Sequence, residues 1–360
     1  MTTALILLFV VLFVVLAFEY INGFHDTANA IATVVSTKVL TPRQALVLAA
    51  GMNLIGALSG QAVAKTIHSG IIDDKVMVVT TLTIFCAMLG GIIWNLITWW
   101  FGMPSSSSHA LIGGLIGAAL AASKGNWNVL VWSREGSKGM EGIFHKVVVP
   151  MITSPLLGLI FGFIFMGLIF WLIRNWRPFW VNSIFSKLQI LSAAYMGFGH
   201  GLADAQKTMG VIMLTLFAST QAGDLDNVPS WLHFLRVPDK GANIPLWIII
   251  TCALVMAAGT YAGGWRIIKT LGHKMVKMKP VHGFAAETTA ATILAATSHF
   301  GMPVSTTHTI TTSIMGVGAA KRWNSIQWGL VERIIWAWVM TIPATALMAF
   351  CIYEVIALFQ

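Results

Sequence analysis

The sequence NGFHDTANAIATVV, residues 22–35, returns in altered form as HGLADAQKTMGVIM, residues 200–213. The aspartates of the two segments, Asp26 and Asp204, are 178 residues apart. Similar segments that recur at a fixed, long offset indicate duplication of a structural unit. These two stretches therefore predict that the chain consists of two related halves.

A second pair of segments follows in the same order. FGMPSSSSHALIGG occupies residues 101–114, and FGMPVSTTHTITTS occupies residues 300–313. The histidines of these segments align at an offset of 199 residues. Because both motifs keep their order, we divide the chain into a first repeat, 1–180, and a second repeat, 181–360.

The segments between the motifs are long and apolar. Of the 360 residues, 57% are hydrophobic and 10% are charged, whereas soluble domains carry about 25% charged residues. Runs such as Ala4–Phe18, Val147–Ile173 and Trp247–Ala258 are continuously apolar. A membrane-spanning helix needs about 20 such residues. The sequence therefore predicts an all-α polytopic membrane protein.

The two aspartate segments lie within unusually long apolar stretches, Ala4–Val39 and Ser186–Ser219. Glycines and polar residues interrupt each stretch near its middle. Such residues are tolerated inside a membrane where a helix breaks against protein or water. We therefore expect one broken transmembrane helix in each half.

The loops between apolar segments differ in charge. If each Gly-Met-Pro segment is the tip of a re-entrant hairpin, the loops 38–43, 174–187, 266–279 and 321–333 share one side, with 13 Lys/Arg and one acid. The loops 67–75, 123–146 and 221–243 share the other, with seven Lys/Arg and seven acids. Basic loops face the cytoplasm. We therefore predict inverted-topology repeats with both termini outside. The net charge of +9 is explained by these basic loops, so no nucleic-acid partner is expected.

Five acids fall outside the loops: Glu19, Asp26, Asp204, Glu287 and Glu354. Glu354 is close to the C-terminal end, where we expect it to reach the membrane interface. A charged Asp at a helix centre costs ~2.5–3.5 kcal/mol on insertion scales. An acid at this depth is by default a hypothesis of function. The alternative is a polar pair that holds two helices together, but the matched positions of Asp26 and Asp204 favour function.

Hydroxyl side chains follow the proline of each hairpin tip. The residues are Ser105, Ser106, Ser107 and Ser108 in the first half, and Ser305, Thr306 and Thr307 in the second. Pro and Ser/Thr favour the start of a helix, where free N–H groups and the positive end of the dipole bind anions. Small residues also permit close helix packing. The repetition after Gly-Met-Pro favours an anion site made by both clusters.

A carboxylate repels an anion unless a cation or proton lies between them. Asp26 and Asp204 therefore predict a coupling-ion or metal site, with Asn22, Asn29 and Gln206 as neutral oxygen ligands for Na⁺ or a divalent cation. Proton binding is the other option, with the histidines of the motifs as relays. Lys207 pairs with Asp204 or binds the substrate. We also assign His25 and Glu287 to the coupling-ion site, and Asn29, Gln206 and Lys207 to the substrate site.

The segments INGFHDTANA, GMPSSSSH, HGLADAQK and GMPVSTTH resemble the signatures of the inorganic phosphate transporter (PiT) family, and its bacterial low-affinity branch in particular. The resemblance covers nearly the whole chain. It implies symport of phosphate, alone or as a metal–phosphate complex, driven by protons or sodium. It also implies that Asp26, Asn29, Asp204 and the hydroxyl clusters line the sites, that the protein lies among lipids in the bacterial cytoplasmic (inner) membrane, and that it forms a homodimer. No tightly bound cofactor and no enzymatic activity are expected.

The chain departs from the family pattern beside both aspartates. Ala203 stands where the second repeat normally has Asn, and His25 stands at the equivalent place in the first. One ligand of the sodium-coupled members is thus missing in each half, which weakens the case for sodium. The central polar insertion of the family is reduced to the loop around 223–241, so no separate soluble domain is expected.

Three alternatives remain open at this stage. A sulfate permease would share the fold and the hydroxyl clusters, and a passive phosphate channel would share the anion site. An intramembrane hydrolase would use Ser108 and His109, but adjacent residues on a helix point about 100° apart.

Overall fold

The computed structural model describes residues 3–69, 71–73, 76, 79–136, 139–239 and 243–359. In chain order, the first half contains α1 (Thr3–Ser36), α2 (Pro42–Ala57), α3 (Ala62–Ser69), α4 (Thr81–Trp100), α5 (Ser107–Ala122), the 3₁₀-helix η1 (Trp127–Val129), the antiparallel strands β1 (Arg134–Gly136) and β2 (Gly139–Glu141), the π-helix η2 (Phe144–Val148) and α6 (Val149–Ile173). The second half contains α7 (Pro178–Gln221), the 3₁₀-helix η3 (Ser230–Leu235), α8 (Leu246–Ala262), α9 (Trp265–Lys269), the π-helix η4 (Thr270–Lys274), α10 (Pro280–His299), α11 (Thr306–Lys321), the 3₁₀-helix η5 (Trp323–Ser325) and α12 (Trp328–Ala357).

Among the described residues, four helical segments are long and apolar enough to cross a bilayer. They are α1, α4, η2 with α6, and α12, and α8 with α9 and η4 forms a further candidate bent by 58°. Large apolar side chains cover their outer surfaces, as Phe161 on α6 and Leu347 on α12 illustrate. The chain is thus a helical, multi-pass membrane protein, as its composition predicts.

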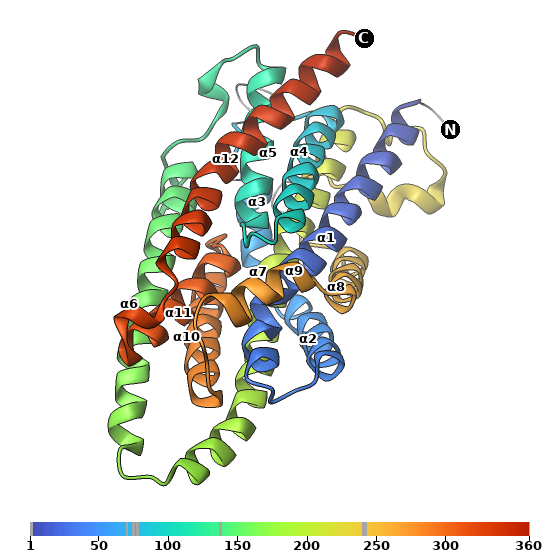
Figure 1. Ribbon diagram of the computed structural model, residues 1–360. Coiled ribbons are helices and arrows are strands. Elements are labelled where there is room, and N and C mark those ends of the chain that lie inside the picture. Colours follow the sequence, from blue (N-terminus) through green and yellow to red (C-terminus); the bar gives the residue numbers. More distant parts are fainter. Residues whose placement is uncertain are drawn as a thin grey trace.

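The two expected hairpins are present. α4 and α5 form the first and α10 and α11 the second, and the two enter the bundle from opposite ends (Figure 1). Each tip turns at a glycine in the left-handed region, Gly102 and Gly301, both with φ of 64°, where only glycine avoids a steric cost. Entry from opposite ends is consistent with inverted repeats.

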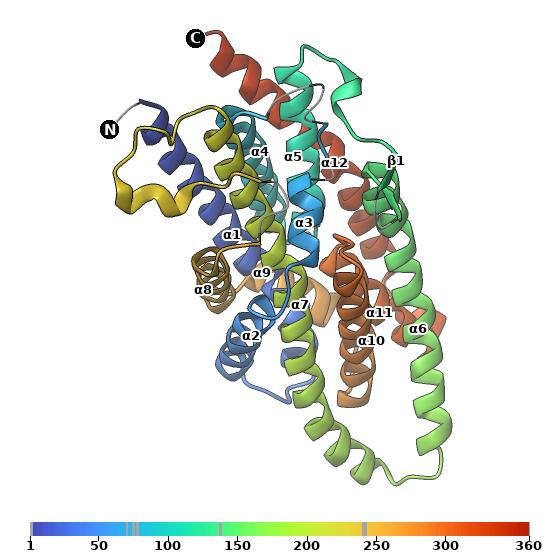
Figure 2. The ribbon, with the colours of Figure 1, turned by 180° about the vertical axis from the view of Figure 1, so that it is seen from behind.

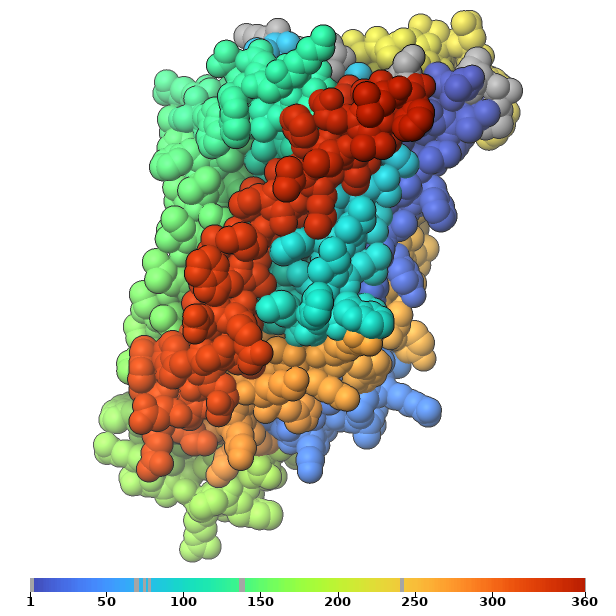
Figure 3. Space-filling view, turned by 45° about the horizontal axis from the view of Figure 1, so that its top comes forward, coloured from blue at the N-terminus to red at the C-terminus, as the bar shows by residue number. Residues whose placement is uncertain are grey.

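The two halves interlock. α6 packs on α11, and α12 packs on α5, so the last helix of each half supports the hairpin of the other. Figure 3 shows α12 crossing one face of the molecule diagonally beside the α4–α5 hairpin. α1 packs on α8 and α2 on α7, and Figure 2 shows the second of these contacts on the opposite face. Residues far apart in sequence therefore meet at the centre.

The expectation of broken helices is wrong for this structure. α1 runs unbroken for 34 residues and α7 for 44 residues, through both aspartate motifs. Most of the polar residues bond to side chains of neighbouring helices or locally, as Thr27 Oγ1 does to the Gly23 carbonyl at 2.7 Å. A helix needs no backbone break where its polar side chains form hydrogen bonds with neighbouring helices.

The glycines of the motifs serve helix packing instead. A Cβ on Gly23 would lie 2.5 Å from the Met256 carbonyl oxygen of α8, and one on Gly201 would lie 2.2 Å from the Asn53 carbonyl oxygen of α2. Gly56 on α2 is equally tight, with 2.1 Å to the Phe198 carbonyl oxygen of α7. Small residues at these crossings let helix backbones touch. This packing places both aspartates at the centre of the bundle.

We predict that Gly56→Ala lowers stability, because its new methyl group must displace the α7 backbone, at a cost of ~1–3 kcal/mol. Gly51→Ala on the same helix is the matched control, since a Cβ there has nothing within 4 Å. The midpoint of thermal unfolding in detergent measures both. Equal midpoints for the two variants would contradict the packing role.

Candidate functional site

The hydroxyl clusters form the first turns of α5 and α11. Ser106 and Ser305 are the N-caps, and each accepts a hydrogen bond, 3.2 Å long, from the backbone N–H of the histidine three residues later. Capping by Ser fixes the start of a helix. The remaining N–H groups of a first turn have no partner within the helix. Each hairpin therefore presents free donors and the positive end of its dipole.

The two helix starts lie side by side at the centre of the protein. His109 and His308 occupy the third position of α5 and α11, and their ring centroids are 4.7 Å apart. The seven Ser and Thr side chains of the two clusters are all buried. The structure thus brings together the two clusters that the sequence assigned to one anion site.

Both aspartates reach the start of α11. Thr306 Oγ1 donates to Asp204 Oδ2 at 2.9 Å, and Thr307 Oγ1 donates to Asp26 Oδ1 at 3.4 Å. Asn29 donates to the hydroxyl groups of the same two threonines, at 3.2 and 3.0 Å. The predicted coupling-ion residues and the second hydroxyl cluster therefore form one connected network.

Lys207 connects this network to the first hairpin. Its ammonium group donates to Ser108 on α5, to Asp204 on its own helix, and to the Val304 carbonyl of the second tip at 2.9 Å. Lys207 is 178 residues after Asn29. Of these equivalent positions, Asn29 contacts the second hairpin through an amide, and Lys207 contacts both hairpins through a charge.

A histidine accompanies each aspartate. His25 Nδ1 lies 2.7 Å from Asp26 Oδ1, and its Nε2 lies 3.1 Å from the Thr98 hydroxyl of α4. His200 Nε2 lies 3.1 Å from Asp204 Oδ2. Ligand atoms of Asp26, His200 and Asp204 lie within 4.8 Å of one another. Two carboxylates and an imidazole at this spacing fit a cation, including a transition metal.

Some predicted residues lie outside this centre. Gln206 faces α3, where its Oε1 accepts from the Val63 N–H at 2.8 Å and its Nε2 donates to the Leu202 carbonyl at 2.7 Å. Gln206 lies two positions after Asp204, and side chains two positions apart on a helix point in nearly opposite directions. Gln206 therefore points away from the site to which the sequence assigned it. Ser105 belongs to the wall of the site and donates to Thr98 at 2.8 Å.

Glu287 also lies apart from the aspartates. It accepts hydrogen bonds from Thr33 on α1 and Ser192 on α7, and from Gln189 at 3.3 Å. Asn22 is buried on α1, and its Oδ1 has no hydrogen-bond partner in the described structure. Asn22 precedes Asp26 on α1, and Glu287 of α10 contacts Thr33, which follows Asp26. The two residues therefore lie on opposite sides of the aspartate network along the axis of α1.

Thr98 and Asn53 are site residues that the sequence motifs do not contain, whereas His200 belongs to the motif histidines expected as proton relays. Asn53 Oδ1 lies 3.1 Å from His200 Nδ1, and its Nδ2 donates to Thr260 at 2.8 Å. Asn53 thereby orients the imidazole toward Asp204. Its only sequence signal is a single amide within the apolar stretch of α2.

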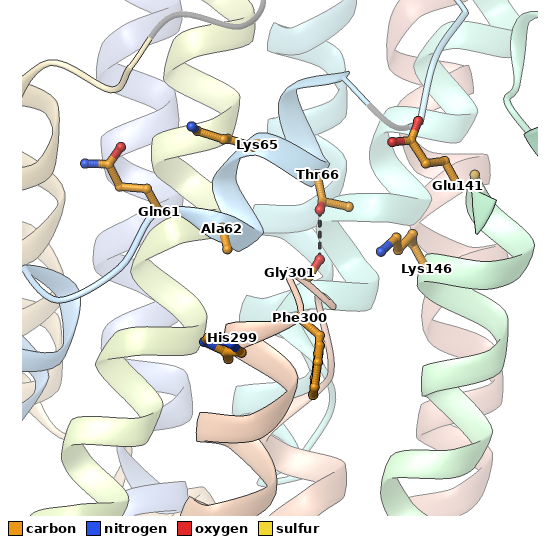
Figure 4. Close-up of a pocket in the computed structure, with 10 residues that line it drawn as sticks. Gln61, Ala62, Lys65, Thr66, Glu141, Lys146, His299, Phe300 and Gly301 are labelled. Carbon is orange, nitrogen blue, oxygen red and sulfur yellow. Dashed lines mark hydrogen bonds between the residues drawn. The ribbon is translucent and has the colours of Figure 1, made fainter. Parts of the chain in front are cut away.

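A cavity of about 540 Å³ lies beside the tip of the second hairpin. Figure 4 shows Lys65, Lys146 and Glu141 around it, with the Thr66 hydroxyl directed at the Gly301 carbonyl, 2.8 Å away. The other tip is held in the same way, since Thr270 Oγ1 donates to the Gly102 carbonyl at 2.8 Å. Each tip is thus fixed by a threonine from a short helix.

The sequence matches the model of the phosphate transporter family over residues 22–349. The chain belongs to the phosphate transporter family. A relative from Rhizobium meliloti, described as a probable low-affinity inorganic phosphate transporter, is 44% identical over 98% of this chain and 97% of its own length. A Bacillus subtilis relative with the same description is 40% identical over 99% of both chains. Membership of a transporter family confirms the expectation that the chain is not an enzyme.

The fold of this chain also matches that of a solved structure. The structure described as the sodium-dependent phosphate transporter matches with a TM-score of 0.80, at 22% identity, over 98% of this chain and 100% of the other. At this identity the match concerns the fold. It confirms the helical membrane architecture that the composition predicts.

We predict that Lys207→Met destabilises this phosphate transporter, because it leaves the buried Asp204 without its ammonium partner. Breaking a buried pair in this way costs about 3–5 kcal/mol. The double variant Lys207→Met/Asp204→Asn removes both charges and should recover much of the lost thermal stability in detergent. A double variant no more stable than the single one would refute the pairing.

Proposed function

We propose that the protein is a secondary active symporter that imports inorganic phosphate across the cytoplasmic membrane, driven by protons or sodium ions. One observation carries this proposal: two helix N-termini rich in hydroxyl groups meet beside two buried aspartates. The first element suits an anion and the second suits a cation. Binding of both to one carrier is the basis of symport.

The anion site would consist of the first turns of α5 and α11 with Asn29 and Lys207. A tetrahedral oxyanion needs donors on several sides, and the two helix starts supply them from opposite hairpins. Ser107 Oγ is buried and has no partner in the described part of the chain, so it is available to a substrate. The descriptions of the relatives as inorganic phosphate transporters support phosphate as that oxyanion.

The coupling-ion site would centre on Asp26 and Asp204. Asp204 already has the Lys207 ammonium as a charged partner, whereas among the described residues the one ionisable partner of Asp26 is His25, whose charge depends on protonation. Of the two aspartates, Asp26 is therefore the one that needs a proton or Na⁺. The structural neighbour is described as sodium-dependent, which supports sodium, while His25 beside Asp26 supports the proton.

A metal–phosphate complex is a second candidate substrate. Asp26, His200 and Asp204 together offer ligand atoms within 4.8 Å of one another. A divalent cation held by these three side chains would lie beside the hydroxyl clusters and neutralise the phosphate.

We expect that Asp26→Asn abolishes accumulation of phosphate in proteoliposomes, because the amide cannot bind the coupling cation. Glu354→Gln is the control, since Glu354 is an exposed acid near the end of α12. Labelled phosphate uptake under an imposed cation gradient measures both. Full accumulation by the Asp26 variant, with protein of normal stability, would remove the ion-site assignment.

Sulfate tests the choice of substrate. Sulfate carries no proton at neutral pH and cannot donate to Asp26 or Asp204, so the site should prefer phosphate. We expect unlabelled sulfate to compete poorly with labelled phosphate for uptake. Equal competition by sulfate would favour a sulfate permease of the same fold, and uptake that only equilibrates would favour a channel.

A further inference from the structure

Glu19 is a buried carboxylate that the site described above does not use. Its side chain is fully buried, at 0% exposure. Thr208 on α7 donates a hydrogen bond to Oε2, and Oε1 has no hydrogen-bond partner in the described structure. The Asn22 side chain, on the next turn of α1, is its other hydrogen-bonding neighbour, and both neighbours are neutral. A buried carboxylate with neutral donors alone is costly unless a proton or cation neutralises it.

Glu19 stands at one end of a polar stripe on α1. Buried polar residues recur at Glu19, Asn22, Asp26, Asn29 and Thr33. Their spacing of three and four residues places them on one helical face. Thr33 at the far end donates to Glu287. Glu19 and Thr33 each lie seven residues from Asp26, which is about 10 Å along the helix.

The two lone carboxylates therefore flank the aspartate network on opposite sides. Glu287 lies toward the end of α1 that leads to the basic loop 38–43, and Glu19 lies toward the N-terminal end. Neither has a counterpart in the other repeat: the offset of 178 aligns Glu19 with Gly197, and the offset of 199 aligns Glu287 with Met88. The two carboxylates therefore depart from the symmetry of the repeats.

The charged groups around Glu19 do not neutralise it. Asp204 and Lys207 act on it from α7, and the Cys252 thiol faces it from α8. The Lys207 ammonium is already bonded to Asp204, Ser108 and the Val304 carbonyl. Among the described residues, these leave Glu19 dependent on a cation from outside the chain.

We propose that Glu19 is a cation-binding carboxylate on the N-terminal side of the aspartate network, which takes up one monovalent cation, a proton or Na⁺, in each transport cycle. The inference rests on the proposed symport. Glu19 would bind the cation with Thr208 as its neighbour on α7, and the polar stripe of α1 would lead from there to Asp26. Glu19 thereby contributes to coupling without contacting phosphate.

The test compares exchange with accumulation in proteoliposomes. Phosphate–phosphate exchange needs no cation gradient, and Gln resembles the neutralised carboxyl. Glu19→Gln should therefore retain exchange close to wild type. With an imposed tenfold gradient, each coupled cation supports about tenfold accumulation, because equal ratios have equal free energies. Accumulation should thus fall about tenfold in this variant, and the proton or sodium gradient that loses its effect identifies the cation.

Two further variants separate charge from packing. Glu354→Gln should retain both exchange and accumulation, and Glu19→Asp should retain accumulation because it keeps a carboxylate. If Glu19→Gln fails to fold, Glu19→Met replaces it, with the same expected result. Normal accumulation by the neutral variant, or loss of exchange together with accumulation, would overturn the role of Glu19. Failure of the wild type to accumulate phosphate under either gradient would instead overturn the proposed symport.

Discussion

The contact of the Lys207 ammonium with Asp204 and both hairpins is the constraint on which the rest of the site depends. Its three partners belong to α7, to the first turn of α5 and to the tip that precedes α11. A buried ammonium group is stable only when all its donors are used and a counter-charge is present. Lys207 therefore fixes the separation of the two helix starts and the position of one aspartate at the same time.

The repeats explain why the site is almost, but not fully, symmetric. Asn29 and Lys207 occupy equivalent positions, and each donates to hydroxyl groups on the hairpin of the other half. The amide leaves Asp26 without an internal charge, whereas the ammonium supplies one to Asp204. The asymmetry makes Asp26 the carboxylate that depends on an external cation. Glu19 and Glu287 extend the same asymmetry toward the two ends of α1.

Much of this arrangement could be predicted from the sequence, because it is encoded locally. The Gly-Met-Pro segments and the hydroxyl residues after them specify a hairpin tip followed by a capped helix, and the structure has a tip at Gly102 and Gly301 with Ser106 and Ser305 as caps. The apolar runs specify helices of membrane length. The matched aspartates indicated two positions that converge, and Asp204 and Asp26 do bond the adjacent threonines Thr306 and Thr307 of α11.

The errors came from contacts between residues far apart in the chain. Gly23 and Gly201 suggested helix breaks, but their role is set by the backbones of α8 and α2, which no local pattern reveals. Gln206 was assigned to the site as a neutral ligand beside Asp204, although its amide bonds the Val63 N–H of α3 and the Leu202 carbonyl of its own helix. Glu287 was grouped with the aspartates because it is an acid within an apolar stretch, whereas its partners are Thr33, Gln189 and Ser192.

The most direct test of an anion site coupled to a cation site is uptake by the wild-type protein with one gradient at a time. Labelled phosphate uptake into proteoliposomes is measured with a proton gradient alone, with a sodium gradient alone, and with neither. Symport predicts that phosphate accumulates above its external concentration under at least one gradient and only equilibrates without any. Simple equilibration under both gradients would contradict it.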